Sequence, residues 1–175
     1  MNNSCGCGCS CSGAGDSETH ICPVCGKDSI AVTSALVNNM LRPDKQDKLA
    51  KDDKYFLCMD GECPVSYFSQ KGSPIFKTED LKVPLWYKKG VEKKIACYCN
   101  NITFEQVREQ VKAGKKSWKE IVGAYRKKPI CKCNVLNPTG NCCTSVFYDI
   151  VNKTLKETGK EPVSQEFIDK LGCCG

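Results

Sequence analysis

Histidine is nearly absent from this sequence, which has His20 alone among 175 residues. Catalysis by a Ser-His-Asp or Cys-His arrangement needs a histidine beside a nucleophile, and one histidine at the edge of a cysteine motif does not form such a group. We therefore expect that the protein is not an enzyme and predict no catalytic residue. His20 is more typical of an exposed residue at a domain edge than of a metal ligand.

Long apolar runs are also missing. The longest mainly apolar stretches, such as residues 29–37, are much shorter than the roughly 18 to 20 residues that span a bilayer. Residues 1–10 lack the cationic start and apolar core of a signal peptide, and no apolar lipobox precedes Cys5. We expect a cytoplasmic protein without membrane insertion, in a compartment where paired cysteines more often bind metal than form disulfides.

The charge balance does not favour a nucleic-acid partner. There are 26 Lys and Arg against 20 Asp and Glu, a formal net charge of +6, and the lysines are dispersed along the chain. Two sites of four thiolates, each with a net charge of about −2 when loaded, would lower the total to about +2. A nucleic-acid interface needs a clustered basic face instead.

Cysteine is unusually frequent, with 16 copies. A first group combines a Cys-x2-Cys pair with a later Cys-x4-Cys pair and consists of Cys22, Cys25, Cys58 and Cys63. Pro23 and Gly26 favour a tight turn around the first pair, and a hairpin turn is predicted between the second pair. Four thiolates at this spacing are typical of a structural zinc site, which has no open position for water or substrate.

A second group predicts an iron–sulfur site. Cys97 and Cys99 lie one residue apart on a predicted extended segment, so both can bind one iron of a [2Fe-2S] cluster. The other iron needs two of four later cysteines: Cys131, Cys133, Cys142 and Cys143. A predicted helix N-terminus after the Cys142-Cys143 doublet stabilises an anionic cluster and favours one of these two. Spacing does not choose between Cys131 and Cys133.

These motifs resemble known families. Cys97-Tyr-Cys99-Asn, two predicted helices, and Asn137-Pro-Thr-Gly-Asn-Cys142-Cys143 are similar to the [2Fe-2S] domain of bacterioferritin-associated ferredoxin-like (BFD-like) proteins. Together with Cys22-Pro-Val-Cys25, Tyr55-Phe-Leu-Cys58, Cys63 and Val65-Ser-Tyr-Phe68, residues 20–157 resemble the N-terminal zinc and [2Fe-2S] domain of CopZ-type copper chaperones. The resemblance implies that the cluster ligands are Cys97, Cys99, Cys133 and Cys143.

The sequence departs from that family in its copper-binding part. Full-length CopZ-type chaperones continue into a ferredoxin-like copper domain with a Met-x-Cys-x-x-Cys motif, which is absent here. Two further cysteine clusters are present: Cys5, Cys7, Cys9 and Cys11, and the doublet Cys173 and Cys174. Because soft thiolates select Cu(I), we hypothesise that these clusters hold Cu(I). The alternative is a nonspecific metal-scavenging or redox-sensitive tail.

We predict an α+β fold with five parts. They are a disordered Cys-rich tail (1–19), a β-rich zinc module (20–87), a lysine-rich linker (88–94), a helical [2Fe-2S] module (95–157), and a short helix with a Cys-Cys tail (158–175). Strands are expected at 29–37, 55–58, 65–68, 75–76 and 83–86. Capping boxes that start at Thr103 and Ser117 predict two helices, and apolar periodicity predicts two more at 144–157 and 164–171.

Two functions follow from these predictions. The leading hypothesis is a copper chaperone or copper-handling protein in which zinc fixes the scaffold and the cluster carries single electrons. Its expected partner is a copper acceptor such as a copper-transporting ATPase. The alternative is a small BFD-like [2Fe-2S] electron-transfer protein, which receives electrons from a donor and serves a larger oxidoreductase or an iron-storage protein.

Overall fold

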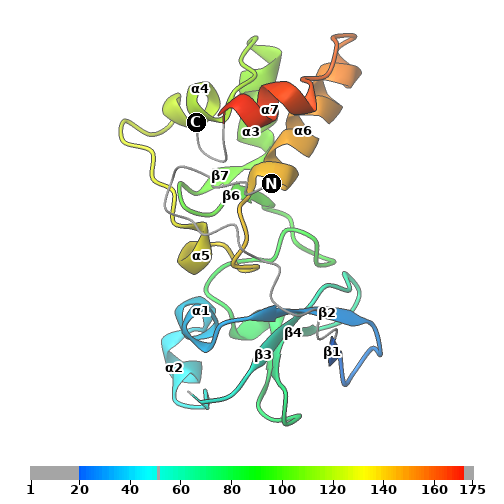
Figure 1. Ribbon diagram of the computed structural model, residues 1–175, viewed down its shortest axis with the longest axis vertical. Helices are drawn as coiled ribbons and strands as arrows, with labels where there is room; N and C mark the ends of the chain where they lie inside the picture. The colour runs from blue at the N-terminus through cyan, green and yellow to red at the C-terminus, as the bar shows by residue number, and fades with distance from the viewer. Residues whose placement is uncertain (1–19, 51, 172–175) are drawn as a thin grey trace. The chain divides into compact units, whose positions relative to one another are not determined.

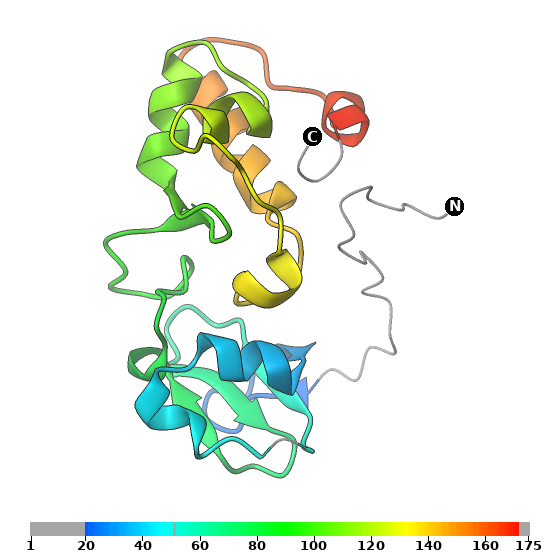
Figure 2. The ribbon, with the colours of Figure 1, turned by 90° about the vertical axis from the view of Figure 1, so that its left-hand side faces the viewer.

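The chain is divided into two compact units, each with its own core (Figure 1, Figure 2). The computed structural model describes residues 20–50 and 52–171. The sheet unit contains residues 20–94 and Asn134–Gly140, and the helical unit contains Ile95–Cys133 and residues 141–171. The combination of helices with antiparallel strands agrees with the predicted α+β class. The predicted tail at 1–19 and the Cys173-Cys174 doublet lie outside the described residues.

The sheet unit is built on a five-stranded antiparallel sheet in the order β1-β2-β3-β4-β5. Its strands are β1 (His20–Ile21), β2 (Asp28–Val32), β3 (Tyr55–Cys58), β4 (Val65–Ser69) and β5 (Ile75–Lys77). The predicted hairpin is confirmed, because Phe56 on β3 lies opposite Phe68 on β4.

Strand β3 is buried along its whole length, and its two faces have different neighbours. Tyr55 and Leu57 belong to a core that includes the buried side chains of α1 (Ser34–Met40). Phe56 and Cys58 point to the other face. They belong to a second core, which also contains Cys22 and Cys63. The two-residue period of the strand therefore places the thiol of Cys58 on the face opposite to α1.

Two predicted strands of this unit differ from the structure, one in its end and one in its existence. The strand expected at 29–37 ends at Val32, because the Thr33 hydroxyl accepts a hydrogen bond of 3.2 Å from the Leu36 backbone N–H and caps α1. The short helix α2 (Pro43–Gln46) follows. The strand expected at 83–86 is replaced by turns after the 3-10 helix η1 (Thr78–Asp80), where Pro84 has no N–H to donate to a ladder.

The helical unit begins with the antiparallel strands β6 (Ile95–Cys97) and β7 (Ile102–Thr103). Its helices are α3 (Phe104–Lys112), α4 (Trp118–Gly123), α6 (Thr144–Glu157) and α7 (Gln165–Leu171). The first residue of the short helix α5 (Cys133–Leu136) also belongs to this unit, and the rest of α5 belongs to the sheet unit. Both predicted capping boxes are present, and α6 has the predicted bounds. Among the described residues, no helix combines the length and the apolar character needed to cross a membrane.

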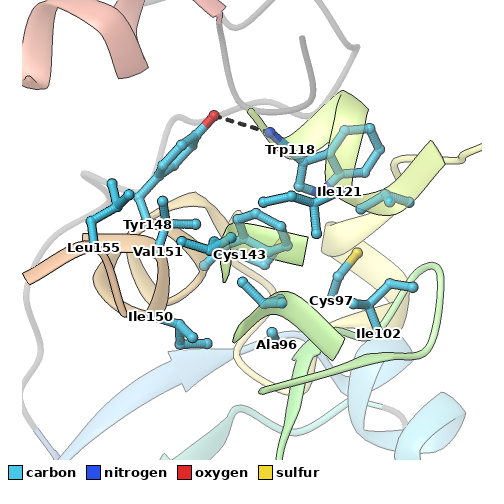
Figure 3. Packing of buried hydrophobic residues seen from close by; sticks show 14 of the residues in the cluster. Ala96, Cys97, Ile102, Trp118, Ile121, Cys143, Tyr148, Ile150, Val151 and Leu155 are labelled. Atoms are coloured by element: carbon cyan, nitrogen blue, oxygen red, sulfur yellow. Dashed lines mark hydrogen bonds between the residues drawn. The ribbon is translucent and has the colours of Figure 1, made fainter. Parts of the chain in front are cut away.

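The core of the helical unit includes three buried cysteines, Cys97, Cys133 and Cys143, of which Figure 3 labels the first and the last. Cys97 and Cys143 are 0% and 2% exposed and lie among the apolar side chains of α3, α4 and α6. The Tyr148 hydroxyl accepts a hydrogen bond of 3.2 Å from the Trp118 backbone N–H, which the dashed line marks (Figure 3). These thiols are therefore held in a packed interior.

The segment Asn134–Gly140 belongs to the sheet unit, although the sequence suggested that it was part of a continuous module at 95–157. The Tyr67 hydroxyl on β4 donates a buried hydrogen bond of 2.7 Å to the Pro138 carbonyl. Gly140 has φ +72°, and a Cβ atom there would approach the Leu36 side chain at 3.2 Å. Glycine at this position thus permits both the left-handed backbone and the close approach to α1.

Candidate metal centres

The first group of cysteines converges on one point at an edge of the sheet unit. Cys22 and Cys25 flank the turn after β1, Cys58 ends β3, and Cys63 lies two residues before the start of β4. Their four sulfur atoms all lie within 4.8 Å of one another, with Sγ–Sγ distances of 4.0 Å for Cys22–Cys63 and 3.6 Å for Cys25–Cys58. A tetrahedral zinc ion with Zn–S bonds of about 2.3 Å separates its sulfur ligands by about 3.8 Å. The geometry of the four thiols therefore fits a single tetrahedral ion.

Backbone N–H groups face these sulfur atoms. Burial raises the pKa of the Cys22 thiol, but hydrogen bonds from the backbone N–H groups of Cys25 and Val24 hold that pKa below its ordinary value. Gly26, at φ +69°, closes the turn with an N–H to Cys22 carbonyl bond of 2.9 Å. The tight turn predicted around the first cysteine pair is confirmed, and within it backbone N–H groups point toward sulfur.

His20 is not a member of this thiol group. Its ring is stacked on Phe56, with ring centroids 4.0 Å apart and an interplanar angle of 5°. Within the described part of the chain, the metal-ligating side chains that converge here are the four cysteines. The stacking fixes the imidazole on an aromatic surface beside the group.

A buried lysine beside the zinc-type group was not predicted from the sequence. The Lys88 side chain donates hydrogen bonds to three backbone carbonyls of the Cys58–Val65 turn: Asp60 at 2.7 Å, Cys63 at 3.0 Å and Val65 at 2.7 Å. Lys88 is only 3% exposed. Burial raises the pKa of the Cys58 thiol, and the charge of Lys88 acts in the opposite direction. A lysine that we expected in a solvated linker therefore supports the turn that carries two of the four cysteines.

The second group of cysteines gathers in the helical unit. Five thiols are close together: Cys97, Cys99, Cys133, Cys142 and Cys143. The Sγ atoms of Cys99 and Cys133 are 3.6 Å apart. The thiols of Cys143 and Cys99 also donate to the Cys97 sulfur and lower the pKa of Cys97 to about 3. Several cysteine sulfurs brought together in this way are the donor set that an iron–sulfur cluster requires.

The geometry favours Cys133 over Cys131 as a member of this group. Cys133 is 2% exposed and lies beside Cys99, Cys142 and Cys143. Cys131 is only partly buried against the same core. The structure therefore places Cys133, the residue implied by the resemblance, among the other thiols of the group.

The geometry also favours Cys143 over Cys142. Cys143 is the N-cap residue of α6, is 2% exposed, and lies beside both Cys97 and Cys133. Cys142 is half-buried, and its sulfur lies 2.9 Å from the Thr144 hydroxyl. The N-terminus of the 14-residue helix α6 carries partial positive charge, which favours an anionic group bound at this end of the helix.

Two N–H groups point at sulfur atoms of this second group. The Asn100 side-chain amide donates to Cys97 Sγ at 3.3 Å, and the Lys132 backbone N–H donates to Cys99 Sγ at 3.2 Å. Asn100 follows Cys99 directly in the Cys97-Tyr-Cys99-Asn motif. The sequence gives no sign of what the Asn100 side chain contacts. Hydrogen bonds to sulfur stabilise the negative charge of thiolates and of iron–sulfur clusters.

Comparison with known proteins supports the first of these centres. Residues 19–82 match a family model described as "Zinc binding domain", named zf_CopZ, and this range includes all four cysteines of the first group. This part of the chain is therefore similar to CopZ-type zinc-binding domains. The predicted metal-binding character of this part of the chain is therefore confirmed, and the four converging thiols of the CopZ-type domain are its candidate ligands.

The similarity to a CopZ protein extends beyond the CopZ-type zinc-binding domain. The structure is similar to the X-ray structure of the Archaeoglobus fulgidus CopZ N-terminal domain, with 28% sequence identity and a TM-score of 0.58. The match covers 82% of this chain and 100% of that domain. No curated protein sequence matches this chain significantly.

Proposed function

We propose that this protein is a non-enzymatic copper-handling metalloprotein with a structural zinc ion and a redox-active [2Fe-2S] cluster. One observation carries the proposal: two separate groups of converging thiols, one in each compact unit, in a chain with a CopZ-type zinc-binding domain. The similarity to the A. fulgidus CopZ N-terminal domain over 82% of the chain supports the same conclusion.

The two groups have different chemical roles in this proposal. Cys22, Cys25, Cys58 and Cys63 hold zinc in a closed shell, which links β1, β3 and the turn before β4. Cys97, Cys99, Cys133 and Cys143 hold the cluster, which when bound supplies one-electron redox chemistry. The apolar core around Cys97 and Cys143 limits the access of water to that group.

Copper is the proposed cargo. The cysteines of the termini, Cys5, Cys7, Cys9, Cys11, Cys173 and Cys174, are the candidate Cu(I) ligands, because thiolates prefer soft ions. A cluster held by Cys97, Cys99, Cys133 and Cys143 would supply the single electron that converts Cu(II) to Cu(I), with a separate electron donor as the source of that electron. The Cu(I) then passes to a copper acceptor such as a copper-transporting ATPase.

Metal analysis of anaerobically purified protein tests the two resident centres. We expect one zinc ion, two irons and two sulfides per chain, a visible absorption spectrum of a [2Fe-2S] protein, and an electron paramagnetic resonance (EPR) signal after reduction with dithionite. Cys25→Ser should lower the zinc content alone, and Cys133→Ser the iron content alone. Colourless wild-type protein without iron would reject the cluster.

Copper binding is tested by a titration of Cu(I) against a competing chelator. Deletion of residues 1–15 should reduce the number of tightly bound Cu(I) ions, because it removes four thiols. Replacement of both Cys173 and Cys174 by serine tests the other terminus in the same assay. An unchanged Cu(I) stoichiometry in both variants would exclude the termini as the copper site.

A BFD-like electron carrier is the second candidate function. It is favoured by the position of the second thiol group within a helical unit that has its own hydrophobic core. The two functions differ in the copper titration and in redox titration. An electron carrier should show a reversible cluster couple with no tight Cu(I) binding, and its reduced form need not convert Cu(II) to Cu(I).

A further inference from the structure

Asn100 is buried beside the second thiol group and is fixed by the backbone of a distant residue. It is 4% exposed. Its side-chain nitrogen donates to the Ile130 carbonyl at 2.8 Å, and its side-chain oxygen accepts from the Ile130 N–H at 3.0 Å. The Asn100 carbonyl also accepts a bond of 2.8 Å from the Arg126 side chain. This residue is therefore held from both its side chain and its backbone.

The pair of bonds to Ile130 determines which way the Asn100 amide points. The Ile130 N–H requires an acceptor and the Ile130 carbonyl requires a donor, so the oxygen and nitrogen of the amide cannot be exchanged. The amide has two N–H bonds, and one of them is used by Ile130. The nitrogen also lies 3.3 Å from Cys97 Sγ, so its second N–H is directed at that sulfur.

A hydrogen bond to a cysteine ligand changes the two redox states of an iron–sulfur cluster unequally. The reduced state carries one more negative charge than the oxidised state, and an N–H donor stabilises the more negative state more strongly. The low exposure of Asn100 and Cys97 keeps competing water away and strengthens this effect. Removal of the donor should therefore lower the reduction potential.

We propose that Asn100 is a positioning residue that raises the reduction potential of the cluster through its bond to Cys97 Sγ. The inference rests on the proposed [2Fe-2S] cluster. The redox step is the transfer of one electron from dithionite to the oxidised cluster, and no bond forms or breaks at Asn100. The residue acts on the cluster through the sulfur of Cys97.

The neighbouring residue Asn101 provides a matched control. Asn101 is exposed and has φ +54°, a conformation that asparagine and aspartate both tolerate. Asn100→Asp and Asn101→Asp therefore add the same group one residue apart, but only the first removes the donor to sulfur. Aspartate at 100 keeps an oxygen that can accept from the Ile130 N–H, but it has no N–H for the Ile130 carbonyl.

The test is a redox titration of the purified holoprotein, followed by visible absorption and EPR. Asn100→Asp should have a lower midpoint potential than the wild type, and Asn101→Asp should shift the potential much less. Equal shifts of the potential in the two variants, or no shift in Asn100→Asp, would contradict the proposed role of Asn100. Neither result would contradict the proposed cluster. Wild-type protein without iron and sulfide would instead overturn the proposed function, and this inference with it.

A measurement on the wild type covers the case in which Asn100→Asp does not assemble a cluster. Protein labelled with nitrogen-15 only in asparagine side chains is reduced and studied by pulsed EPR. A nitrogen-15 coupling to the cluster is expected, since the Asn100 nitrogen is hydrogen-bonded to a ligand sulfur. Labelled Asn101→Asp should keep the coupling. Its absence from the wild-type spectrum contradicts the proposal.

Discussion

A single ammonium group stabilises the turn that carries Cys58 and Cys63. The Lys88 nitrogen donates to three carbonyls of this turn, and the neighbouring Tyr87 hydroxyl donates to the Cys58 carbonyl at 2.9 Å. These bonds satisfy backbone oxygens that the turn cannot pair within the sheet. The positive charge also lies near a zinc shell whose four thiolates give a net charge of about −2. Lys88 therefore contributes both hydrogen bonds and charge balance.

Lys88→Met should lower the free energy of unfolding of the zinc-loaded protein by about 2 to 4 kcal/mol, because it removes three hydrogen bonds from a charged donor. Urea denaturation at neutral pH measures this change. Lys89→Met is the matched control: its side chain is 74% exposed and pairs with the exposed Glu62. It should change stability by less than about 0.5 kcal/mol. Equal losses in the two variants would contradict the role of Lys88.

Sequence patterns do not distinguish Lys88 from Lys89. The two adjacent lysines have the same chemistry, and the prediction placed both in a solvated linker. The buried environment of Lys88 comes from carbonyls at residues 60–65, whose positions depend on the hairpin and on the thiol group. Cysteine spacing, by contrast, can be read from the sequence alone. It identified the four cysteines of the first group as one candidate metal site, and their thiols converge in the structure.

At the scale of elements, local signals in the helical unit were sufficient. Thr103 and Ser117 each form the predicted capping box, in which a hydroxyl accepts from a backbone N–H three residues later. These signals involve four consecutive residues and do not depend on the rest of the fold. The strand predicted at 29–37 was wrong because apolar content alone does not separate a strand from a helix, and the capping role of Thr33 was overlooked.

Ser117→Ala should destabilise the helical unit by about 1 kcal/mol, since it removes the N-cap of α4. The Ser117 hydroxyl accepts from the Glu120 N–H at 3.3 Å and donates to the Glu120 carboxylate at 2.7 Å. Thermal unfolding followed by circular dichroism measures the loss. Lys119→Ala changes an exposed position in the same helix and should stay within about 0.5 kcal/mol of the wild type. A similar loss for both would show that the cap is not the cause.

At the scale of the whole molecule, neither compact unit is a single continuous stretch of the chain. Residues 134–140 belong to the sheet unit, although cysteines on both sides of them belong to the helical unit. The contact of Tyr67 with the Pro138 carbonyl joins residues 71 positions apart. Such a contact depends on the surface that the folded sheet presents, and sequence patterns of neighbouring residues carry no signal for it.

Loss of the first thiol group should therefore affect two separate stretches of the chain. In Cys58→Ser we expect loss of zinc and faster amide hydrogen exchange in β2, β3 and β4, and also in Asn134–Gly140. Protection in α3 and α6 should persist, because these helices share a different core. Mass spectrometry of peptide fragments measures the exchange.

Met59→Ser is the control for this experiment, since Met59 is 37% exposed and follows Cys58 directly. It should retain zinc and the wild-type exchange pattern. If Asn134–Gly140 instead kept its protection together with α3 and α6, its assignment to the sheet unit would be wrong.

The place of Asn134–Gly140 limits how the gene can be divided. A fragment that starts at residue 95 would contain Asn134–Gly140 but not Tyr67, whose hydroxyl donates to the Pro138 carbonyl. In that fragment the buried residues of the segment, including Asn137 and Thr139, would face water. A fragment that stops at residue 94 would expose the surface of α1 near Leu36 that Gly140 covers. An exchange of residues 20–94 or of residues 95–171 between homologous proteins would break the same contacts. To keep them, the seven residues Asn134–Gly140 would have to be exchanged together with the sheet.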